Sequence, residues 1–252
     1  EKYKSPIPTL TSPIKDAKAF YKFLKSEQGG NFREDHIEYL EGAGVTRDSI
    51  ATALGTFLNQ VDEKDYVVVY LSGHGMVESR HTTRYYFLPT EADAGNLSGT
   101  AVRMNNIYQW IKESPAAKKL IIADVCHSGA ITATGAATKG TNAVHDYLES
   151  LSKTYGGMGV FTSSRATQLS QEFTSEDKRK DPKKNKSVFT YYLLEALGSK
   201  ATEVDSEGKQ DGVVDVKEAF EWVRKKVSEH TNSAQIPDFK GDNETGMPLA
   251  VV

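Results

Sequence analysis

Two segments that each contain an unbroken apolar run, residues 65–71 and residues 118–126, constrain the fold more than any other feature of this chain. Runs of this length that are rich in Val and Ile are typical of strands buried on both faces, as in the centre of a parallel sheet. Each run ends in small and polar residues, which include His74 after the first run and His127 after the second. Open α/β sheets bind ligands at the carboxyl ends of their strands. If the two strands are parallel neighbours, we expect His74 and Cys126 to face each other there.

The order of the other segments predicts an α/β fold in a single domain over residues 1–252. Helical spacing of apolar residues begins at Pro13 and continues to about Glu27, and Thr46 opens a second helix before the first buried strand. Further expected elements are a strand over 36–41, a hairpin strand over 85–89, helices over 105–113, 188–197 and 215–229, and strands over 156–163 and 247–252. Residues 129–142 have the composition of a surface loop. Strands that alternate with helices imply a mostly parallel sheet with helices on both faces.

Composition and charge exclude several classes of function. The formal net charge of −3 provides no general attraction to nucleic acid or to an anionic membrane. No apolar run approaches the roughly 20 residues that span a bilayer, and no signal peptide opens the chain. The single Cys excludes an internal disulfide framework and a cysteine-based zinc site, and the His residues show no metal-ligand spacing. We therefore expect a cytoplasmic protein that requires no cofactor and binds neither nucleic acid nor membrane.

Cys126 and His74 are the candidate catalytic pair. A free cysteine is most often a small buried hydrophobe, and a lone histidine near apolar residues is most often a core residue. Against this reading, Cys126 is followed by polar residues and Gly129, and His74 lies between Gly73 and Gly75. Glycine lets the backbone turn tightly and approach a substrate closely, so we expect a turn that exposes the imidazole. A thiol beside an imidazole suits nucleophilic catalysis with a general acid and base.

The segments Leu71-Ser72-Gly73-His74-Gly75 and Asp124-Val125-Cys126-His127-Ser128-Gly129 resemble the two catalytic motifs of the caspase-like cysteine peptidases (clan CD, family C14), in the metacaspase and bacterial caspase-homologue branch. The histidine lies about 50 positions before the cysteine, as it does in that family. Residues 8–17, 161–164 and 188–191 resemble its first helix, fifth strand and fourth helix. The resemblance implies the caspase-hydrolase fold, with an open, mostly parallel six-stranded sheet and helices on both faces. It also implies that the family's first strand lies upstream of residue 1.

The resemblance implies a catalytic role for each residue that matches the two motifs. Cys126 corresponds to the thiolate nucleophile, and His74 corresponds to the general acid and base. The backbone N–H groups of Gly75 and Cys126 correspond to the donors that hold an oxyanion. No third residue that orients the imidazole can be named from the sequence.

Asp124 is the residue that we expect to decide specificity. It lies two positions before the nucleophile and therefore points to the same side of its strand; the alternative is a strand-end carboxylate that is solvated or caps a turn. In the metacaspase branch, the matching aspartate forms the floor of the S1 pocket with positions that match Asp16 and Ser72, and we add Ser163 to this candidate pocket. Paired carboxylates attract Lys or Arg, so cleavage after basic residues is expected. True caspases place arginines in this pocket, and Arg165 is near enough in the sequence to keep acidic specificity as an alternative.

Two other charged segments leave alternatives open. The charge run at residues 176–184 is most simply a solvated loop, and alternatively a site of self-cleavage or of partner contact. Residues 207–218 resemble part of a calcium-binding loop, but Lys209 occupies a ligand position. A turn followed by a capping box of Asp215 and Glu218 explains the same pattern. Type I metacaspases need calcium, so the resemblance leaves calcium activation open, although no residue of this chain can be assigned to it.

The leading interpretation is a cysteine endopeptidase that cleaves proteins or peptides after Arg or Lys through a thioester acyl-enzyme. A caspase-shaped interaction module without activity and a transamidase or ligase on the same fold are the two alternatives. The presence of both Cys126 and His74 disfavours the first, and competition between amines and water would detect the second. The expected partners are a protein or peptide substrate and an upstream regulatory domain or partner.

Overall fold

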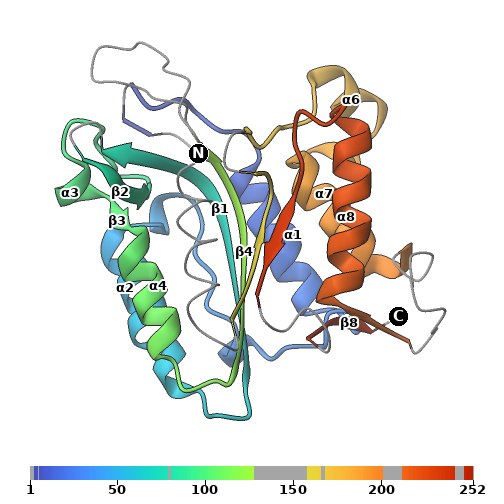
Figure 1. Cartoon of the computed structure of the whole chain (residues 1–252), viewed down its shortest axis with the longest axis horizontal. Helices are drawn as coiled ribbons and strands as arrows, with labels where there is room; N and C mark the ends of the chain where they lie inside the picture. Colours follow the sequence, from blue (N-terminus) through green and yellow to red (C-terminus); the bar gives the residue numbers. More distant parts are fainter. Residues whose placement is uncertain are drawn as a thin grey trace.

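The computed structural model describes residues 3–4, 6–78, 81–127, 158–165, 168–200, 212–241 and 247–251. Its centre is a six-stranded sheet with the strand order β3-β2-β1-β4-β5-β7 (Figure 1). These strands are β1 (Tyr66–Glu78), β2 (His81–Phe87), β3 (Val102–Arg103), β4 (Lys118–His127), β5 (Met158–Thr162) and β7 (Asp238–Lys240). β1 pairs in parallel with β4, and β4 pairs in parallel with β5, whereas β2 and β7 are antiparallel to their neighbours. Because β3 is antiparallel to β2, four of the six strands run in the same direction.

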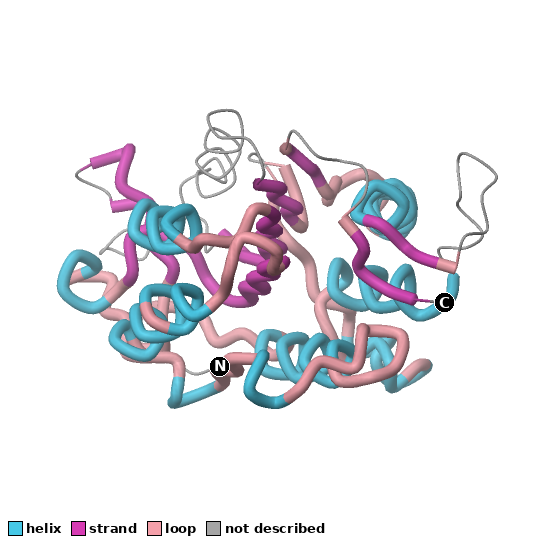
Figure 2. Tube along the Cα trace, turned by 90° about the horizontal axis from the view of Figure 1, so that it is seen from below, coloured by secondary structure: helices cyan, strands magenta, loops and turns pink. Residues whose placement is uncertain are grey.

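Helices cover both faces of this sheet, as Figure 1 and the view from below in Figure 2 show. One face packs against α1 (Pro13–Leu24), α7 (Val188–Glu195) and α8 (Val216–His230), and the other packs against α2 (Arg47–Gly55) and α4 (Met104–Glu113). The shorter helical segments are α3 (Leu97–Thr100), α6 (Ser175–Lys180), four 3-10 turns (Glu34–His36, Gly42–Gly44, Phe57–Gln60 and Pro182–Lys184) and a π turn (Ala196–Lys200). A separate two-stranded sheet pairs β6 (Val213–Asp215) with β8 (Pro248–Val251). The predicted α/β class, with a mostly parallel six-stranded sheet between helices, is confirmed.

The central strand β4 shows how the sequence produces these layers. Successive strand residues point to opposite faces of a sheet. Leu120 and Ile122 lie in the core beneath α1, α7 and α8, whereas Ile121, Ala123 and Val125 lie in the core beneath α2 and α4. All five side chains are fully buried, at 0% exposure. The strand is therefore buried on both faces, as its unbroken apolar run predicts.

The structure corrects two local predictions and adds a strand that the sequence analysis did not name. Residues 37–41 do not form a strand, because no strand of the described part of the chain lies beside them to complete a hydrogen-bonded ladder. The turn expected at residues 73–75 is also wrong, since β1 continues through it to Glu78. The strand predicted over 247–252 is present as β8, which pairs with β6, and the edge of the main sheet is formed by β7, which the sequence did not predict.

Other local predictions are confirmed. The segment over 85–89 overlaps β2, which pairs with β1 as a hairpin, and the capping box that opens α8 is present, with the Glu218 N–H donating to Asp215 Oδ1 at 3.0 Å. The loop predicted at 129–142 lies outside the described residues, as does the part of the calcium-loop pattern before residue 212.

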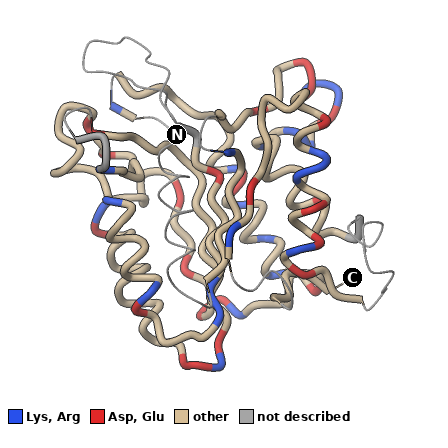
Figure 3. Tube along the Cα trace, in the orientation of Figure 1, with Lys and Arg blue, Asp and Glu red and all other residues tan. Residues whose placement is uncertain are grey.

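The charge run at residues 176–184 is not a loop throughout, because most of it forms α6 and the 3-10 turn after it. Figure 3 shows acidic and basic residues interspersed along the side of the molecule that carries α6 and α8. None of the helices that the structure describes combines the length and the apolarity needed to cross a bilayer.

Candidate active site

The register between β1 and β4 places His74 directly opposite Cys126 on neighbouring parallel strands. The same register places Ser72 opposite Asp124. On β1, Val67, Val69 and Leu71 point into the core beneath α2 and α4. By alternation, His74 and Ser72 therefore belong to the other face. On β4, Leu120 and Ile122 pack beneath α1, α7 and α8. Positions 124 and 126 of β4 alternate in step with these two residues and belong to that same face. All four candidate positions on these strands therefore lie on one face at the carboxyl end of the sheet.

His74 is buried at 3% exposure, which corrects the expectation of an exposed imidazole on a turn. Its Nε2 lies 2.9 Å from the backbone oxygen of Pro8, and its ring centroid lies 5.1 Å from that of Tyr3. A carbonyl oxygen only accepts hydrogen bonds, so Nε2 carries the proton. The neutral imidazole then has its basic lone pair on Nδ1. The Pro8 carbonyl is thus the group that orients the imidazole, and no sequence pattern could indicate it because the acceptor is a backbone atom.

Gly75, a predicted oxyanion donor, follows His74 within β1, where it pairs with His127 of β4 and with Phe87 of β2. The Leu88 N–H, just after β2, donates to the His74 carbonyl at 2.9 Å and extends the hydrogen bonding between β2 and β1. The backbones of Gly75 and Cys126 therefore lie at adjacent positions of two paired strands. Their role as oxyanion donors stays a prediction.

Asp124 is 2% exposed and is held by a shell of hydroxyl groups. Ser170 Oγ donates to Oδ1 at 2.7 Å, Thr190 Oγ1 donates to Oδ2 at 2.9 Å, and the Ser187 hydroxyl also donates to Oδ2. Burial raises the pKa of Asp124, and the hydrogen bonds from Ser187, Ser170 and Thr190 oppose this shift, as does Ser163. Both carboxylate oxygens thus accept hydrogen bonds within the protein.

Asp16 lies in the first turn of α1 and is buried, at 1% exposure. It is far from Asp124 in the sequence. The Ser187 N–H donates to its Oδ1 at 3.0 Å, so Ser187 bridges the two carboxylates. Its second oxygen, Oδ2, is buried and has no hydrogen-bond partner among the described residues. Burial raises the pKa of Asp16 well above its usual value, the charge of Asp124 raises it further, and the Ser187 N–H acts in the opposite direction. A buried carboxylate oxygen that lacks a donor can accept a hydrogen bond from a cationic ligand.

The two serines predicted for this pocket also lie on its side of the sheet. Ser72 is partly buried, and Ser163, which follows β5, is fully buried. Arg165, the residue that kept acidic specificity open, is exposed, and its backbone N–H donates to Gln168 Oε1 at 3.4 Å. In the described part of the chain, no group of three or more His, Cys, Asp and Glu side chains is arranged to hold a metal ion.

The sequence prediction missed most of the residues that build the site. Ser187 is the N-cap of the apolar helix α7, and its hydroxyl oxygen accepts the Thr190 N–H at 2.9 Å. The preference for Ser at N-cap positions was the available signal. Ser170 lies in a segment without regular structure apart from one isolated bridge, and no local pattern marks it.

The sheet order, the helices on both faces and the opposed histidine and cysteine positions define an α/β protein with the caspase-hydrolase fold. The chain matches the caspase domain of peptidase family C14 over residues 1–245, and it belongs to that family. The fold of this protein is therefore that of a cysteine-peptidase family.

Two solved structures are similar to this chain. Protein GSU0716 from Geobacter sulfurreducens aligns with a TM-score of 0.60 and 14% identity over 97% of this chain and 91% of that one. Caspase-1 from Spodoptera frugiperda aligns with a TM-score of 0.56 and 14% identity over 96% of this chain and 82% of that one. At this identity the likeness extends to the fold alone. None of the curated proteins compared with the chain matches it.

Proposed function

We propose that this protein is a cysteine endopeptidase that uses His74 and Cys126 and cleaves proteins or peptides after Arg or Lys. The observation that carries the proposal is the register of β1 and β4, which sets these two positions opposite each other beside two buried carboxylates. Membership of the caspase family supports the peptidase chemistry. The proposed partners are a protein or peptide substrate and a regulatory domain or partner, and the proposed compartment is the cytoplasm.

In this mechanism the sulfur of Cys126 attacks the carbonyl carbon of the scissile bond. The negative charge on the carbonyl oxygen is held by the N–H groups of Gly75 and Cys126. His74, whose Nε2–H is engaged by the Pro8 carbonyl, accepts the thiol proton on Nδ1 and returns it to the leaving amine. Water then attacks the thioester and releases the acid.

The acidic pocket supports specificity for a basic P1 residue. Asp16 offers an oxygen that lacks a donor among the described residues, and Asp124 adds negative charge while its own oxygens remain bonded to hydroxyls. A cationic side chain satisfies this pocket, whereas an acidic one adds a third carboxylate to it. Ser72 and Ser163 complete the proposed S1 pocket.

A panel of fluorogenic peptides with Arg, Lys, citrulline or Asp at P1 tests the proposal. We expect turnover of the Arg and Lys peptides and none of the Asp peptide, and an Arg chloromethyl ketone is expected to add once, to Cys126, as seen by mass spectrometry. The Cys126→Ala variant is the matched control. Absence of turnover and of labelling would favour the interaction module, and products that carry an added amine in place of water would favour the transamidase.

The pocket should make recognition of a basic P1 residue depend on pH. Burial and the neighbouring Asp124 raise the pKa of Asp16, so this carboxyl becomes neutral at a higher pH than an exposed aspartate does. Below the raised pKa, a cationic P1 residue must displace the proton of Asp16. The KM for the Arg peptide is therefore expected to rise by about tenfold for each pH unit by which the pH falls. Titrations common to both substrates cancel in the ratio of kcat/KM for the Arg and citrulline peptides. A ratio that stays constant from pH 4 to pH 8 would contradict this assignment.

A further inference from the structure

We propose that Glu172 is a positioning residue that sets the catalytic histidine and the S1 carboxylate in place together, through the segment of residues 7–12. We call this segment the strap. The inference rests on the proposed function for the roles of His74 and Asp16, and it adds a residue that acts on both of them from outside the site.

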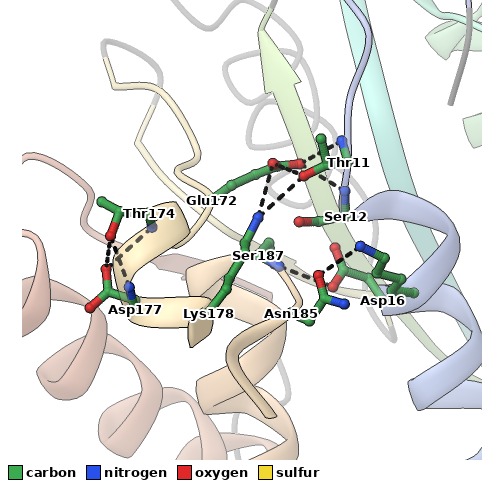
Figure 4. Close-up of polar contacts among 10 residues, drawn as sticks. Thr11, Ser12, Asp16, Glu172, Thr174, Asp177, Lys178, Asn185 and Ser187 are labelled. Carbon is green, nitrogen blue, oxygen red and sulfur yellow. Dashed lines mark hydrogen bonds and ion pairs between the residues drawn. The ribbon is translucent and has the colours of Figure 1, made fainter. Parts of the chain in front are cut away.

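The carboxylate of Glu172 is bonded to the C-terminal end of the strap. Its Oε1 accepts the Thr11 N–H at 3.0 Å and the Ser12 N–H at 2.8 Å, and its Oε2 accepts the Thr11 hydroxyl. Lys178 of α6 lies alongside, with Nζ 3.6 Å from Oε2 and 3.2 Å from Thr11 Oγ1. Figure 4 shows the carboxylate turned toward both strap residues, with the lysine beside it. Partial burial would raise the pKa of Glu172, but the hydrogen bonds from Thr11 and Ser12 lower it.

The strap connects the Glu172 carboxylate to the His74 imidazole and to Asp16. At one end, the Pro8 carbonyl accepts the Nε2–H of His74 at 2.9 Å. At the other end, Ser12 precedes α1, and its carbonyl accepts the Asp16 N–H at 2.9 Å. Only three residues separate Pro8 from Ser12, so the position of the strap at Glu172 constrains the imidazole and the carboxylate at once.

The backbone of Glu172 is also held by Ser187, the residue that hydrogen-bonds to both S1 carboxylates. Its backbone forms an isolated antiparallel bridge with Ser187, and the Val188 N–H donates to the Gln171 carbonyl at 2.9 Å. Ser187 itself donates to Asp16 and Asp124. Glu172 thus lies between the strap on one side and the residue that bridges the two carboxylates on the other.

Loss of this anchor should affect both halves of the site. A strap that moves away from His74 withdraws the acceptor that keeps the proton on Nε2, so the other neutral tautomer gains population and the basic nitrogen is misplaced. The same movement shifts the first turn of α1 and with it Asp16. We therefore expect a lower kcat, through His74, together with a higher KM for basic substrates, through Asp16.

The test compares Glu172→Ala and Glu172→Gln with Glu176→Gln. This control removes an exposed acid of α6 that forms an ion pair with Lys180 on the same helix. In Glu172→Ala, we expect the amides of residues 11 and 12 to exchange at least about tenfold faster, because three hydrogen bonds to a charged group are lost. Histidine ¹⁵N spectra should show His74 leaving the Nε2–H form. For the Arg peptide, kcat/KM should fall roughly 10²-fold. Glu172→Gln keeps one acceptor oxygen and should lie between wild type and Glu172→Ala.

Two of these measurements do not require peptidase activity. If the wild-type protein cleaves no peptide, the proposed function fails, while amide exchange and the His74 tautomer still decide the role of Glu172. Unchanged His74 spectra and unchanged exchange at residues 11 and 12 in a folded Glu172→Ala protein would overturn the inference. If Glu172→Ala does not fold, the same readouts in Glu172→Gln decide it, and wild-type values there would overturn it as well.

Discussion

The Asp16→Asn variant is expected to lose 10²- to 10³-fold in kcat/KM for Arg and Lys peptides, which is about 3–4 kcal/mol, the loss expected when one partner of a buried charge pair is removed. The reason is that Asp16 Oδ2 is buried and accepts no hydrogen bond within the described structure, which leaves it for a cationic P1 side chain. Alkylation of Cys126 by uncharged iodoacetamide should stay at the wild-type rate, because the hydrogen bond that the Asp16 carboxylate accepts in the described structure comes from Ser187 and not from His74. The citrulline peptide is the matched control, and its turnover should change far less than that of the Arg peptide.

The same variant should not be less stable than the wild type near neutral pH. Burial holds the pKa of Asp16 in the folded protein above its value in the unfolded chain, so the folded state binds more protons at intermediate pH. Asp16 therefore destabilises the fold fully at any pH above the raised pKa. This cost shrinks as the pH falls below that pKa and is gone below the ordinary pKa of an aspartate. We expect Asp16→Asn to melt at or above the wild-type temperature at pH 8, with the difference shrinking toward pH 4. A lower melting temperature at pH 8 would mean that Asp16 serves the fold, not the substrate.

Much of this architecture was predictable because it depends on short-range patterns. The apolar run that became β4 is long enough to identify a strand buried on both faces, and side-chain alternation alone places Asp124 on the side of Cys126. The spacing of the two motifs identified His74 and Cys126 as partners, and the paired register agrees with that prediction. Each of these inferences needs only neighbouring residues and the geometry of a strand.

The surroundings of these residues were not predictable, because they are supplied by distant segments. The hydroxyls that bond to Asp124 come from Ser170, Ser187 and Thr190, between 46 and 66 positions along the chain. The histidine was expected on an exposed turn because glycines flank it, yet β1 continues through it and Tyr3 and Pro8 lie against its ring. Local propensity cannot reveal contacts that form only after the sheet and its helices pack together.

The Asp124→Ala variant is expected to lower the free energy of unfolding by about 3–5 kcal/mol, since several buried donors lose their acceptor at once and each costs about 1–3 kcal/mol. The donors are the hydroxyls of Ser170, Ser187 and Thr190, which are all buried. Rotation of these hydroxyls toward other acceptors keeps the total below the sum of the separate costs. Denaturant unfolding followed by circular dichroism measures the change, and Ser170→Ala, which removes one donor and leaves the acceptor with two others, should cost about 1 kcal/mol.

This expectation separates two roles for Asp124 that the sequence alone treats as one. A carboxylate whose oxygens already accept hydroxyls from the protein acts first as the centre of a buried network, and it contributes to the S1 pocket through its charge and through Ser187, which it shares with Asp16. If Asp124→Ala is as stable as the wild type and yet loses all turnover of Arg peptides, Asp124 binds the substrate directly, and the hydroxyl shell must open when substrate enters. If the variant is destabilised while Asp16→Asn is not, the two carboxylates have different tasks: Asp124 holds the pocket together, and Asp16 binds the cation.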